Sequence, residues 1–93
     1  MKTIEAVSRY DRRKVKEVRT YRSITLDEAK ALSYGDHIKV LDRHGAVADA
    51  KVNGAVKRWK REPDRIEIPC KYGLYEYFTL TNRDYDTIVV EVD

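Results

Sequence analysis

The chain has 93 residues, a formal net charge of +3, 42% hydrophobic residues and 38% charged residues. This length suits one domain, and the composition is too apolar for a disordered chain and too charged for a membrane protein. The sequence has no apolar run of about 18 residues and no apolar N-terminal stretch, so we expect a cytoplasmic protein without a membrane partner.

The N-terminal segment is strongly basic. Residues 1–22 carry eight basic and three acidic side chains, a net charge of +5. We interpret residues 1–14 as a basic N-terminal arm and residues 15–93 as a single small β-barrel domain that opens with a strand over residues 15–22. The cations of the arm that we expect to contact a polyanion are Arg12, Arg13 and Lys14.

A short helix is predicted near residues 25–33. Thr25 stands three residues before Glu28, which is the spacing of a capping box. Leu26 and Ala29 recur at helical spacing, and Gly35 follows as a residue that can end a helix. Because two helical turns are unstable in isolation, we expect this helix to pack on a larger element.

The hydrophobic period changes to two after the helix, which predicts β-strands. The expected strands cover residues 37–42, 46–52, 55–61, 65–70, 74–80 and 88–92. Gly45 suits a turn with positive φ, and Asn53-Gly54 predicts a type I′ hairpin. Pro63 suits the second position of a further turn.

The fourth of these strands, residues 65–70, alternates cleanly. Ile66, Ile68 and Cys70 share one face, which predicts that all three are core residues, and Pro69 indicates an edge strand or a strand end. Six short strands with tight turns predict a mainly β fold, a barrel or sandwich similar in pattern to the SH3-like small barrels, with one short α-helix.

Several segments carry a resemblance to known proteins: Ile24–Leu32, Tyr34–Asp36, Val52–Gly54, Val56–Arg61 and Lys71–Tyr75. Through these turns and strands the chain resembles a group of small uncharacterised proteins found in bacteriophages and prophages. The resemblance implies a mobile-element origin and supplies no activity and no site.

A second basic block covers residues 51–72, with seven basic and three acidic side chains. Within it, four cations surround one indole: Lys57, Arg58, Trp59, Lys60 and Arg61. Cations neutralise phosphates and an exposed indole stacks on an unpaired base, so the motif predicts nucleic-acid binding. The alternative is that Trp59 fills a small core while the cations surround it.

Two tyrosines of the strand at residues 74–80 form a second candidate surface. Tyr75 and Tyr77 share one face, whereas Leu74, Phe78 and Leu80 are expected on the other. Paired tyrosines on a solvent-facing sheet are a stacking platform of single-strand binders. The alternative is ordinary cross-strand packing of aromatic side chains.

The composition offers little for catalysis. His37 and His44 lack further ligands at metal-binding spacing, no base stands near Cys70, and there is no phosphate loop. We therefore expect a protein that is not an enzyme and has no cofactor and no metal.

Our leading hypothesis is a nucleic-acid-binding domain whose affinity comes mainly from phosphates. The alternative is a protein-interaction module of a phage or mobile element, which modulates a host protein or is an accessory part of the virion. The aromatic residues would then anchor the interface and the cations would pair with an acidic protein partner. Residues 73–93 carry one basic and five acidic side chains. If these acids lie beside the basic surface, a protein partner is favoured. If they lie on the opposite side, the basic surface is free to bind nucleic acid.

Overall fold

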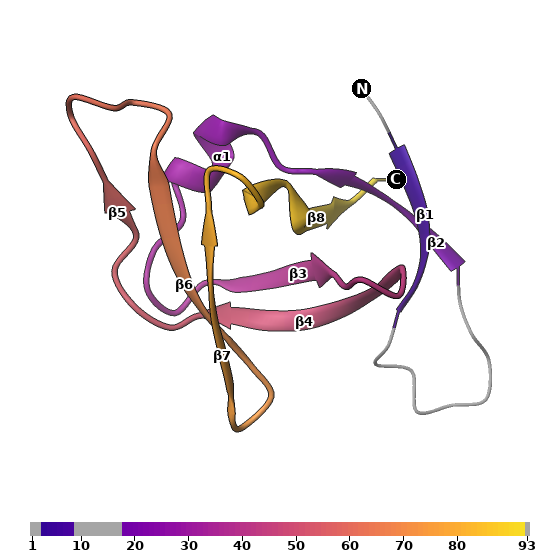
Figure 1. Cartoon of the computed structure of the whole chain (residues 1–93). Coiled ribbons are helices and arrows are strands. Elements are labelled where there is room, and N and C mark those ends of the chain that lie inside the picture. Colours follow the sequence, from indigo (N-terminus) through magenta and orange to yellow (C-terminus); the bar gives the residue numbers. More distant parts are fainter. Residues whose placement is uncertain (1–2, 9–17, 93) are drawn as a thin grey trace.

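The computed structural model describes residues 3–8 and 18–92. Within these residues the fold is mainly β with a single short α-helix, α1 (Leu26–Lys30), which confirms the predicted fold class (Figure 1). One turn of 3₁₀ helix, η1 (Tyr85–Thr87), precedes the last strand. The strands are β1 (Thr3–Ser8), β2 (Val18–Ser23), β3 (His37–Leu41), β4 (Ala46–Val52), β5 (Lys57–Arg58), β6 (Ile66–Tyr72), β7 (Glu76–Thr81) and β8 (Ile88–Glu91).

Five of the strands close into a ring. The order β1-β2-β8-β3-β4 is antiparallel throughout, and β4 then pairs in parallel with β1, where Val7 is opposite Ala46. The sheet continues outward from β4 to β6, which carries both β5 and β7. The ring is a small barrel of the kind that the sequence predicted, and the β6–β7 hairpin projects from it (Figure 1).

The larger core lies on the face of the sheet that α1 covers. Ile66, Ile68 and Cys70 alternate inward along β6, as the sequence predicted, and each is at most 1% exposed. Burial raises the pKa of the Cys70 thiol to about 11, so the thiol stays protonated at neutral pH. The buried members of this core are Ile24, Ala29, Ile38, Ala50, Val52, Val56, Ile66, Ile68, Cys70, Leu80 and Ile88.

A second, smaller core fills the ring. Each of the five ring strands contributes one side chain to it, namely Ala6, Tyr21, Leu41, Val47 and Val89. Consecutive residues of a strand point to opposite faces, so Ile88 joins the larger core and Val89 the smaller one. The two cores therefore lie on opposite faces of β8, β3 and β4.

The helix α1 begins with the predicted capping box. The Thr25 hydroxyl accepts from the Glu28 amide at 3.2 Å, and the Glu28 carboxylate accepts from the Thr25 amide at 3.0 Å. The same carboxylate accepts two hydrogen bonds from Arg22 of β2, at 2.7 and 3.0 Å. Glu28 therefore joins the start of the helix to the ring.

Glu28 is expected to make the stability of the domain sensitive to acid. Hydrogen bonds from Arg22 and Thr25 lower the pKa of Glu28 to about 2. Because the folded pKa lies below the unfolded value of about 4.3, this stabilisation is complete above that value and is lost as the pH falls toward 2. Denaturant midpoints measured across this range should fall more steeply for the native chain than for Glu28→Gln. Parallel profiles would contradict the assignment.

The chain around Asn53 and Gly54 differs from the prediction. Gly54 does not have a positive φ, and the expected long strand over residues 55–61 is only the two residues of β5, which pair with β6 rather than β4. The Asn53 amide donates to the Pro69 carbonyl at 2.8 Å, and a Cβ on Gly54 would come within 3.0 Å of the Pro69 ring. The type I′ hairpin was therefore wrong. Gly54 permits a close approach to Pro69 instead of a tight turn.

Pro69 lies within an interior strand, and the prediction of an edge or strand end was wrong. It faces Thr79 of β7 on one side, and its carbonyl accepts from Asn53 on the other. On that second side the β4 ladder stops at Val52, opposite Cys70, and the β5 ladder starts at Lys57, opposite Glu67. The missing N–H of Pro69 falls in this break, where no ladder hydrogen bond is lost.

The structure also changes the boundary of the predicted N-terminal arm. Thr3–Ser8 form β1, which pairs with β2 and β4 and contributes Ala6 to the smaller core. The first strand of the domain is thus inside the segment 1–14 that we interpreted as an arm. Val18–Ser23 form β2, within and just beyond the predicted strand over residues 15–22.

Candidate nucleic-acid interface

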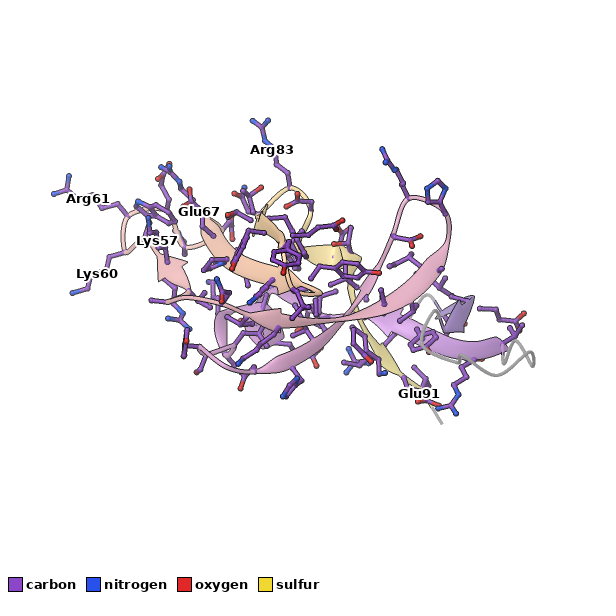
Figure 2. The ribbon with its side chains drawn as sticks, turned by 90° about the horizontal axis from the view of Figure 1, so that it is seen from below. Lys57, Lys60, Arg61, Glu67, Arg83 and Glu91 are labelled. Atoms are coloured by element: carbon purple, nitrogen blue, oxygen red, sulfur yellow. The ribbon has the colours of Figure 1, made fainter. Side chains whose placement is uncertain are left out.

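The cations of the basic motif occupy one end of the molecule. Lys57 and Arg58 form β5, and Lys60 and Arg61 follow in the loop to β6, where all four side chains are exposed. Lys60 and Arg61 point away from the sheet into solvent, whereas Lys57 lies opposite Glu67 of β6 (Figure 2). Acidic side chains are interleaved with them, since Glu62 and Asp64 line the adjacent hollow together with Arg65 and Arg83. This end therefore carries mixed charge.

Arg58 is bound to the C-terminal end of α1. Its Nε donates to the Lys30 carbonyl at 2.8 Å, and its Nη2 donates to the Leu32 carbonyl at 3.1 Å. The last carbonyls of a helix have no hydrogen-bond partner within the helix. They also form the negative end of the helix dipole, which a nearby cation stabilises. Arg58 thus has a structural contact that the sequence analysis did not foresee.

Replacing Arg58 with alanine is expected to lower the free energy of unfolding by about 1 kcal/mol, because charged hydrogen bonds to helix carbonyls are lost at a partly solvated site. Chemical denaturation measures the effect, and Lys60→Ala is the matched control, since Lys60 is an exposed cation two residues away. An Arg58→Ala variant with native stability and lost nucleic-acid affinity would instead place Arg58 in the binding surface.

Trp59 belongs to neither core and is partly buried under a neighbouring cation. The Arg65 guanidinium carbon is 4.1 Å from the centroid of the indole ring, and Arg65 also donates to the Glu62 carboxylate at 3.0 Å. A cation over an indole face is itself a stabilising contact. One face of Trp59 is therefore occupied by Arg65.

The turn between β6 and β7 lies at the opposite end of the hairpin from the basic loop between β5 and β6 (Figure 1). β6 has seven residues, so its two ends are about 20 Å apart. Tyr75 lies in the turn before β7, and Tyr77 is on β7, with exposed fractions of 88% and 64%. Leu74 is 75% exposed, so the prediction that it faces inward was wrong, whereas Phe78 and Leu80 do pack on the larger core.

The strand register assembles a different set of basic and aromatic side chains. Residues His37, Lys51, Lys71 and Tyr77 are successive partners across β3, β4, β6 and β7. Inward-facing neighbours such as Ile38, Val52 and Cys70 are buried, so this row lies on the outer face of the sheet. The pairing places two lysines directly opposite each other, an arrangement that costs stability unless a counter-charge is nearby.

Neither lysine of this pair forms an ion pair with an acidic side chain among residues 3–8 and 18–92. The Asp49 carboxylate, two residues before Lys51, accepts from Lys39 at 3.1 Å. The Lys71 ammonium lies 5.4 Å from the centroid of the Tyr77 ring. The pair therefore keeps its positive charge beside an exposed ring.

A polar hollow of about 420 Å³ lies beside the lysine pair. It is lined by Tyr34, His37, Asp49, Ala50, Lys51, Asn53, Lys71 and Gly73. The Asp49 carboxylate that pairs with Lys39 therefore also borders it. The turn that carries Tyr34 is held to the end of β4, because the Gly35 amide donates to the Val52 carbonyl at 2.8 Å. Tyr34 is 69% exposed. We call the surface formed by Tyr34, His37, Lys51, Lys71 and Tyr77 the lysine–tyrosine face.

The sequence analysis identified only Tyr77 of this face as a binding residue. Lys51 and Lys71 are twenty residues apart, and each stands alone among apolar or small neighbours. Both lie in the second basic block, residues 51–72, and Lys51 also stood on a predicted strand, whereas Lys71 fell just after one. The register that places them opposite each other is not visible in the sequence.

Among the described acidic residues of the C-terminal quarter, Glu76, Asp84 and Glu91 lie at three separate places. Glu91 of β8 accepts from Arg19 of β2 at 3.2 Å, at the far end of the molecule from Arg61 (Figure 2). Asp84 accepts from the Thr81 amide and hydroxyl in the turn before η1. Glu76, in contrast, precedes Tyr77 on β7 and pairs with Tyr72, which follows Lys71, so one acidic residue of this quarter lies near the lysine–tyrosine face.

Arg12, Arg13 and Lys14 lie outside the described residues. Across residues 3–8 and 18–92, no three His, Cys, Asp or Glu side chains come together as a metal site would need. No helix in that part of the chain is long and apolar enough to span a membrane.

No protein-family model, no curated protein and no solved structure matches this chain. The resemblance to phage and prophage proteins and to SH3-like barrels therefore stays a prediction from the residues quoted above.

Proposed function

We propose that this chain is a non-enzymatic domain that binds nucleic acid through the lysine–tyrosine face. The observation that carries the proposal is the pair Lys51 and Lys71, directly opposite on β4 and β6, with no acidic partner among the described side chains and with the exposed Tyr77 next in the row. Phosphate oxygens supply the counter-charge that such a pair lacks.

Most of the affinity would then be electrostatic, with little discrimination between sequences. Lys57, Lys60 and Arg61 would add long-range attraction from the far end of the hairpin, where they are exposed among acidic neighbours. Tyr75 extends the aromatic surface at the hairpin tip.

The direct test is the salt dependence of binding to a labelled oligonucleotide. Four phosphate contacts would give a slope of about −3 in log affinity against log salt, which is roughly a fiftyfold loss between 50 and 200 mM. Fluorescence anisotropy measures it. Binding weaker than about 100 μM at physiological salt, for both single and double strands, would overturn the proposal.

A protein partner is the second candidate, and Leu74 favours it. Leu74 and Tyr75 are 75% and 88% exposed at the tip of the β6–β7 hairpin. Adjacent apolar and aromatic side chains in such a position are typical anchors of protein interfaces. If no nucleic acid binds, capture of an acidic protein partner that is lost in Leu74→Ala would support this candidate.

A further inference from the structure

The order of the side chains across the lysine–tyrosine face indicates which kind of nucleic acid the face would bind. Across the strands, the sequence of side chains is His37, Lys51, Lys71 and Tyr77, with Tyr34 at the hollow beside Lys51. Neighbouring strands are about 4.8 Å apart, so the row is about 14 Å long. Two cations thus lie between aromatic side chains on either side.

The exposed rings are the informative part of this arrangement. Tyr34 and Tyr77 are 69% and 64% exposed, and neither belongs to a core cluster. In a duplex the base faces are stacked on one another, so a surface ring cannot reach them without unstacking the helix. In a single strand those faces are free to stack on tyrosine.

Lys71 lies where a phosphate contact and a base-stacking contact meet. Its ammonium is 5.4 Å from the centroid of the Tyr77 ring and its strand partner is Lys51. A base stacked on the open side of Tyr77 would therefore have its own or the next phosphate within reach of the two lysines. The hollow of about 420 Å³ beside them has room for that phosphate group.

We infer that the ligand of the lysine–tyrosine face is a single strand, with a phosphodiester group at Lys51 and Lys71 and a base stacked on Tyr77. This inference rests on the proposed function and narrows it to one class of nucleic acid. Tyr34, across the hollow, provides the second stacking position for a neighbouring base.

The experiment compares a labelled thymidine single strand of about 12 nucleotides with a duplex of the same length, at physiological salt, on the full chain. We expect the single strand to bind about tenfold more tightly. Tyr77→Ala should lower single-strand affinity about tenfold, which is the effect of losing one stacked base, and should change the duplex affinity by less than about twofold. The salt slope should stay unchanged, because no cation is removed.

Two controls separate stacking from damage to the fold. Tyr77→Phe keeps the ring and should retain the single-strand affinity. Leu74→Ala removes a side chain of similar exposure from the same hairpin and should have no effect. Circular dichroism checks that each variant is folded.

The possible failures are distinguishable. Equal affinity for single strand and duplex, or an equal loss of both in Tyr77→Ala, overturns the single-strand inference and leaves nucleic-acid binding in place. Absence of binding to either ligand overturns the proposed function as well.

Discussion

Replacing Lys51 and Lys71 together with alanine is expected to weaken nucleic-acid binding about thirtyfold at low salt. The estimate takes about 1 kcal/mol for each lost lysine–phosphate contact, as for exposed ion pairs, and converts about 2 kcal/mol to affinity. Removing two contacts should also flatten the salt slope by between one and two. Stability should be unchanged or slightly raised, because the two like charges face each other on β4 and β6.

The matched control removes the same charge from the other end of the hairpin. Lys57→Ala combined with Lys60→Ala deletes two exposed cations of the basic loop. We expect it to reduce affinity only a few-fold, because these side chains stand among Glu62, Asp64 and Glu67. The reverse ranking of the two double variants would move the interface to the basic loop and reject the lysine–tyrosine face.

Ile68→Ala is expected to have the largest effect on stability of any single change considered. Ile68 is fully buried in the middle of β6, opposite Leu80 of β7, and belongs to the larger core. Truncation of a buried isoleucine to alanine costs about 2–5 kcal/mol, because the lost contacts leave a cavity. For a domain whose total stability is about 5–15 kcal/mol, this variant would be close to unfolding.

Urea denaturation measures the loss in the free energy of unfolding, and two further variants serve as references. Ile68→Val removes one methylene and should cost about 1 kcal/mol. Leu74→Ala removes a side chain that is 75% exposed and should change the stability by less than about 0.5 kcal/mol. A loss below about 1 kcal/mol for Ile68→Ala would mean that β6 is not the centre of the larger core.

The candidate site shows which inferences from sequence were secure and which were not. Lys57, Lys60 and Arg61 were recognised because they stand within five residues of one another in the chain, and they are exposed as expected. Their neighbours Arg58 and Trp59 have other contacts, namely the end of α1 and the Arg65 guanidinium. A cluster of cations in the sequence does not reveal which of them meet carbonyls or rings of the same chain.

Local signals within the sequence determined much of this protein. The capping box at Thr25, the alternation of Ile66, Ile68 and Cys70, and the positive φ of Gly45 all depend on residues within a few positions of one another, and each was confirmed. Such features follow from hydrogen bonds and steric limits inside one turn or one strand, so a single segment is enough to specify them.

The tertiary structure alone decided the long-range pairings. Closure of β1 onto β4, the break between β4 and β5 opposite Pro69, and the facing of Lys51 and Lys71 each join residues from separate parts of the chain. Register is set by which apolar side chains can be buried together, and a shift by one residue would turn every outward side chain inward. The lysine–tyrosine face is therefore a product of the strand register that burial of the apolar side chains imposes.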